Sequence, residues 1–99
     1  MWPRAVALLA RQALETAVED VWEVVAPHSP RVSMRARLLC FEEFLPAGLA
    51  GEVAYTWTAL SNAVHFHPYE LAPTGVEIEQ LLDLTAAAVA SLEEARGPY

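Results

Sequence analysis

The residues of this chain best suited to chemistry lie together between positions 61 and 67. The sequence there reads SNAVHFH, so that Asn62, His65 and His67 fall within seven residues. Such side chains can donate protons and hydrogen bonds to a ligand. The structural alternative is that both histidines bond the last carbonyls of a helix and the loop that follows it.

Aromatic residues flank this segment and suggest a small-ligand site. Trp57 precedes the histidines and Tyr69 follows them. A cavity lined by Trp57, Tyr69 and His65 would combine an apolar wall with a few polar groups, which is the usual composition of a ligand pocket. These three residues are therefore the candidates for ligand binding.

The same histidines make a poor metal site. On a helix His65 and His67 lie about 200° apart and cannot face one ion. His28 or Glu70 would have to act as a third ligand, at a spacing unlike that of known zinc sites. The glycines are scattered and form no phosphate-binding loop. We therefore predict no metal and no cofactor.

A resemblance extends from Trp57 to Thr74. This stretch resembles a segment of small uncharacterised all-helical proteins from GC-rich bacteria, and residues 61–67 resemble the active-site motif of the HEPN superfamily. That motif is Arg, a polar residue that is often Asn, about four more residues, and then His. Asn62 and His67 match its polar and His positions, whereas Ser61 stands where the family has its essential Arg.

The HEPN resemblance implies a helical bundle that forms dimers. It also implies a metal-independent ribonuclease of a toxin–antitoxin or defence type, with Asn62 and His67 as catalytic residues. A nuclease needs a cation beside the scissile phosphate. Because Ser61 supplies none, Arg35 or Arg37 would have to provide it.

The charge balance disfavours nucleic acid as a partner. The chain has a formal charge of -7, and its six basic residues are all arginine. A net negative protein repels a phosphate backbone. The local cluster of Arg31, Arg35 and Arg37 can bind an anion or a partner, or pair with the acidic stripe of the first helix. That stripe consists of Glu15, Glu19 and Glu23. Cys40, the single cysteine, forms no internal disulfide and is interpreted as a small buried hydrophobe.

Apolar spacing and breaker residues predict four helices. The first runs from about Arg4 to Val25 and ends before Pro27; the second follows a Ser29 or Ser33 cap and reaches about Leu45. The third runs from Leu49 to near Phe66, and the fourth begins at a Thr74 capping box and ends near Arg96. We therefore predict an all-α fold, a four-helix up-and-down bundle, with residues 1–99 forming a single domain.

The hydrophobic content of 55% is high for a soluble domain and suggests a surface that a partner covers. Trp2 and Trp22, a helix length apart on the first helix, suggest that this helix packs against a second copy. No segment resembles a signal peptide or a membrane span, so a cytoplasmic location is expected. The predicted function is a homodimeric interaction or regulatory module without catalysis of its own, for which a further protein partner is a candidate, and a HEPN-like ribonuclease is the alternative.

Overall fold

Four helices make up the fold. The computed structural model describes residues 3–30, 32–65 and 74–97. Within these ranges the chain forms α1 (Pro3–Val25), α2 (Met34–Phe44), α3 (Leu49–Val64) and α4 (Gly75–Arg96). The all-α bundle of four helices predicted from the sequence is confirmed. None of the helices described is both long enough and apolar enough to cross a membrane.

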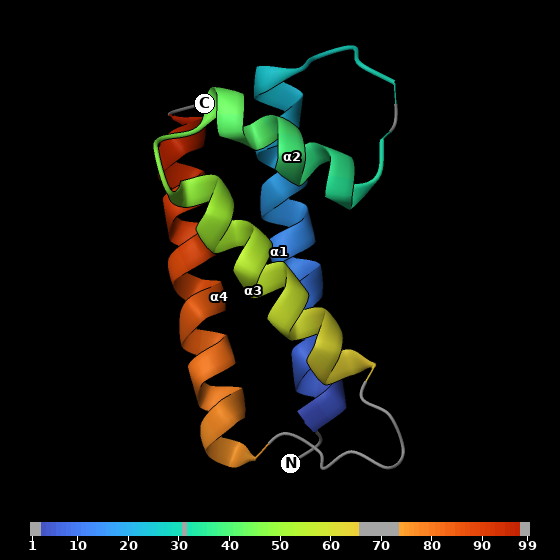
Figure 1. The fold of residues 1–99 in the computed structure, drawn as a ribbon, viewed down its shortest axis with the longest axis vertical. Coiled ribbons are helices and arrows are strands. Elements are labelled where there is room, and N and C mark those ends of the chain that lie inside the picture. Colours follow the sequence, from blue (N-terminus) through green and yellow to red (C-terminus); the bar gives the residue numbers. More distant parts are fainter. Residues whose placement is uncertain (1–2, 31, 66–73, 98–99) are drawn as a thin grey trace.

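Three long helices form the body of the bundle, and α2 lies across one end of it (Figure 1). α1 and α4 run side by side in the same direction, and α3 runs opposite to both. The ion pair between Asp20 and Arg96, at 3.4 Å, joins the C-terminal parts of α1 and α4. At 11 residues, α2 is about 16 Å long, less than half the length of α1. It packs on α3 and α1, and within the described ranges it does not contact α4.

The core follows the apolar spacing of each helix. Leu14, Val18 and Val21 of α1 are almost fully buried. The other large side chains with no more than 1% exposure are Phe41, Val53, Leu60, Ile78 and Leu92. The three α1 positions lie four and three residues apart, and Val53 and Leu60 of α3 lie seven apart, as one face of a helix requires.

Two predictions of exposure were wrong. Trp22 is only 8% exposed and its ring packs against Phe41 with centroids 6.1 Å apart, so it belongs to the core and cannot line an interface with a second copy. Trp2 lies outside the described residues. Cys40 is exposed instead of buried, because the buried face of α2 is formed by Leu38 and Phe41.

The helices begin at the residues that the sequence indicates. Ser33 caps α2 by accepting the N–H of Ala36. Gly48 precedes α3 with a φ of 87°, a left-handed conformation that glycine adopts without strain. At α4 the Thr74 hydroxyl accepts the N–H of Glu77, and the Glu77 carboxylate accepts the N–H of Thr74. This reciprocal capping box is confirmed.

Replacing Thr74 by alanine should lower the free energy of unfolding by about 1 kcal/mol, because the hydroxyl that accepts the Glu77 N–H is lost. Urea denaturation followed by circular dichroism measures this change. Thr58→Ala, at an exposed position inside α3, serves as the control and should leave the midpoint nearly unchanged. A Thr74→Ala midpoint equal to that of the parent would show that the capping box contributes nothing to stability.

Candidate functional site

The last two turns of α3 hold the described residues of the predicted histidine site. Trp57 and Ser61 are half-buried, and Asn62 and His65 are exposed. His65 is the C-cap of α3, and its backbone N–H donates to the carbonyl of Ser61 at 3.0 Å. This backbone bond is one that any residue at the position would make, and the His65 ring contacts Arg11 of α1, so the predicted bonding of helix carbonyls by the histidine side chains stays a prediction. His67 and Tyr69 lie outside the described residues.

Arg11 of α1 joins this site, and the sequence analysis missed it. Its Nη1 lies 3.3 Å from Nε2 of His65, and its guanidinium carbon lies 4.2 Å from the ring centroid of Trp57. A guanidinium has no acceptor, so in this contact Arg11 donates and Nε2 of His65 accepts. The Arg11 Nε lies 3.6 Å from the Glu15 carboxylate, which balances the cation. The only sequence signal was the Arg11–Glu15 spacing of four residues.

Arg35 and Arg37, which the sequence analysis named as sources of a cation for this site, behave differently. Arg37 pairs with Glu19 of α1 at 3.7 Å, which confirms ion pairing with the acidic stripe of the first helix. Arg35 is exposed on α2, and Arg31 lies outside the described ranges. The guanidinium that contacts the α3 histidine therefore comes from Arg11.

Polar groups at this end of α3 can bind a small ligand or hold α3 against α1. The Ser61 hydroxyl is buried and has no hydrogen-bond partner among the described residues. Asn62 presents its amide to solvent. In the described part of the chain, no three His, Cys, Asp or Glu residues gather closely enough to hold a metal ion.

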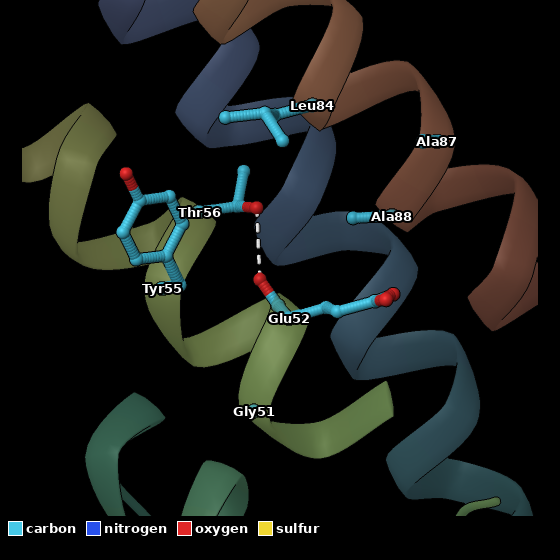
Figure 2. Close-up of a pocket in the computed structure, with 7 residues that line it drawn as sticks. All are labelled: Gly51, Glu52, Tyr55, Thr56, Leu84, Ala87 and Ala88. Carbon is cyan, nitrogen blue, oxygen red and sulfur yellow. Dashed lines mark hydrogen bonds between the residues drawn. The ribbon is translucent and has the colours of Figure 1, made fainter. Parts of the chain in front are cut away.

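A second place of interest is a groove between α3 and α4, which we call the α3–α4 groove (Figure 2). It encloses about 390 Å³ and is lined by Gly51, Glu52, Tyr55, Thr56, Leu84, Ala87 and Ala88. The Thr56 hydroxyl donates to the backbone carbonyl of Glu52 at 2.8 Å, so its donor is used inside α3. Tyr55 and Leu84 remain 65% and 39% exposed. The groove is thus largely apolar and open to a partner.

Sequence reasoning did not find the α3–α4 groove. Gly51 and Ala87 are small residues at exposed helical positions, and such residues look like neutral helix surface in a sequence. Their effect appears only when α3 and α4 pack together and leave a hollow between them.

The fold and these two places define a small all-α bundle with a polar cluster at one helix end and an apolar groove along two helices. No protein-family model, no curated protein and no solved structure matches the chain.

Proposed function

We propose that the protein is a homodimeric interaction module without catalysis of its own, and that the α3–α4 groove is the surface a second copy covers. The main observation in support of this interface is an apolar hollow of about 390 Å³ with Tyr55 and Leu84 exposed at its edges. This role is proposed for the cytoplasm, where a chain with a single cysteine needs no oxidising compartment.

The lining of the groove suits helix packing. Gly51, Ala87 and Ala88 have small side chains, so another helix can approach closely and bring its own side chains into the hollow. In a two-fold dimer each copy offers the same patch, so Tyr55 of each copy can insert into the groove of the other. The Glu52 carboxylate at the edge gives an acceptor for the inserted phenol.

Exposed apolar side chains elsewhere on the described helices also favour a surface that a second copy covers. Large hydrophobic residues exposed by 39–66% occur on all four helices of the described chain: Leu8, Leu9, Leu39, Phe44, Tyr55, Val76, Leu82 and Leu84. Two of them, Tyr55 and Leu84, line the α3–α4 groove together, and contiguous exposed apolar surface often marks an association site. Because each copy carries a charge of -7, repulsion opposes dimerisation, and salt should strengthen it.

Sedimentation equilibrium at tens of micromolar is expected to give twice the monomer mass of 10.9 kDa. Ala87→Glu places a carboxylate in the groove and should weaken the dimer at least about tenfold by burying an unpaired charge. Ala86→Glu adds the same charge at the adjacent exposed position, which does not line the groove, and should leave the dimer intact.

Three results would contradict this proposal. A parent chain that sediments at 10.9 kDa would exclude the dimer. A dimer that survives Ala87→Glu, or one that both variants disrupt equally, would exclude the α3–α4 groove as its interface.

A HEPN-like ribonuclease remains the second candidate, and the Arg11–His65 contact of 3.3 Å is what favours it. Arg11 supplies a guanidinium near the end of α3 despite Ser61. On this hypothesis Asn62 and His67 are catalytic, and Arg11 takes the place of the missing Arg of the motif.

The two candidates forecast different results with RNA. As an interaction module, the purified chain should not cut single-stranded RNA in EDTA, and His65→Asn should lower stability by about 1 kcal/mol through the lost hydrogen bond. Metal-independent cutting that disappears in His67→Ala and in Arg11→Gln, while helicity and melting temperature persist, would overturn the non-catalytic assignment in favour of the ribonuclease.

A further inference from the structure

Gly51 is a glycine that the described part of the chain does not require. It lies inside α3, at an exposed position in the first turn of that helix. A β-carbon built there would meet no atom within 4 Å outside its own helical turn. Since glycine loses more conformational freedom on folding than alanine does, alanine at this position would favour the helix. The missing side chain therefore weakens α3 and makes room for no other described residue.

The position of Gly51 in the α3–α4 groove gives this space a use. The large lining residues are Tyr55 and Leu84, which are 65% and 39% exposed. Gly51 lies one turn before Tyr55 on α3, and Ala87 and Ala88 lie one turn after Leu84 on α4. Because α3 and α4 run in opposite directions, both steps lead the same way along the groove. The groove therefore has large side chains at one end and small residues at the other (Figure 2).

A second copy related by a two-fold axis fits this arrangement. In such a dimer, if one residue contacts another across the interface, the same contact occurs a second time with the copies exchanged. The α3 residues that line the groove span positions 51–56. An axis through the middle of this span sets the two α3 helices antiparallel and places Tyr55 of each copy opposite Gly51 of the other. The large end of each groove then fills the small end of its partner.

We infer that Gly51 is the seat for the Tyr55 ring of a second copy and determines which surface the groove accepts. Without a β-carbon at position 51, the flat ring lies directly against the backbone of α3 and buries most of its area. A methyl group at this position holds the ring away from the helix. This inference rests on the proposed dimer and deepens it by naming the pair of residues that fit together.

Gly51→Ala adds a single methyl group at the seat. Sedimentation equilibrium should show a dissociation constant raised at least about tenfold, because a ring in contact with the backbone leaves no room for the methyl group. Gly75→Ala is the matched control. Gly75 also lies in the first turn of a helix with open space around its β-carbon, but it does not line the groove. This control should change the dissociation constant less than about twofold.

The same substitution should stabilise the monomer. In an Ala87→Glu background, which weakens the proposed dimer, Gly51→Ala should raise the melting temperature by about 2–8 °C because alanine favours α3. Circular dichroism at low micromolar concentration measures this shift. Opposite effects on the monomer and on the dimer separate a seat for a second copy from a structural role inside the chain. A lower melting temperature would show that the chain itself needs glycine at this position and would overturn the inference.

Disulfide trapping locates the contact. In a Cys40→Ser background, chains that carry Gly51→Cys are mixed with chains that carry Tyr55→Cys and are oxidised with diamide. Mass spectrometry should find the mixed disulfide in excess over both symmetric disulfides, because positions 51 and 55 of different copies face each other. A mixture of Gly75→Cys and Tyr55→Cys chains is the control and should show no such excess.

Failure of the dimer and failure of the seat can be told apart. A parent chain that is monomeric would remove the proposed dimer and the seat with it. A parent dimer that Ala87→Glu disrupts and Gly51→Ala leaves intact would keep the α3–α4 groove as the interface and overturn the seat alone. The absence of an excess of the mixed disulfide in such a dimer would overturn the seat as well.

Discussion

Replacing Phe41 by alanine is expected to lower the free energy of unfolding by about 3–5 kcal/mol. Phe41 has no exposed surface, packs its ring 6.1 Å from that of Trp22, and is the largest fully buried side chain in the described core. It also joins α2 to the body of the bundle. Its removal leaves a cavity that α2, which among the described helices packs on α1 and α3 alone, closes incompletely.

Phe44→Ala provides the matched control. Phe44 lies one turn further along α2 and is 54% exposed, so its truncation should cost less than about 1 kcal/mol. Urea denaturation followed by circular dichroism measures both changes. Equal costs for the two variants would show that α2 does not pack through Phe41. An additional transition in Phe41→Ala would mean that α2 detaches before the rest unfolds.

Replacing Leu92 by alanine should cost about 2–5 kcal/mol, because this α4 side chain has no exposed surface. Leu82 is a leucine of the same helix and serves as the control. In the structure Leu82 is 40% exposed, so Leu82→Ala should cost well under half as much. A calorimetric comparison of the two melting temperatures tests the rotation of α4 about its axis. Similar losses would place Leu82 in the core.

The helix boundaries could be predicted because local chemistry sets them. Ser33 and Thr74 accept the N–H groups that start α2 and α4. Gly48 supplies a left-handed residue before α3. These signals act over three or four residues, which a sequence displays directly.

The arrangement of the helices and the partners within the site depend on distant contacts. Arg11 and His65 are 54 residues apart, and nothing in their local sequence connects them. Trp22 appeared available for a second copy because its spacing does not identify its neighbour, and that neighbour is Phe41 of α2. Cys40 lies beside the apolar residues of α2, yet it is exposed. Such outcomes follow from how α2 crosses α1, which helical periodicity does not determine.

The pairing of α1 with α4 affects how the chain acquires its structure. α1 makes its most extensive contacts with α4, so the first of the four helices in chain order depends most on the fourth. Until residues 75–96 are available, α1 lacks the most extensive of its helix contacts. Bringing α1 and α4 together closes a loop that contains most of the chain. The conformational entropy lost in closing this loop must be offset before the core contributes stability. Folding should therefore be a late, concerted event, and a nascent chain that ends after α3 should expose an apolar surface to chaperones.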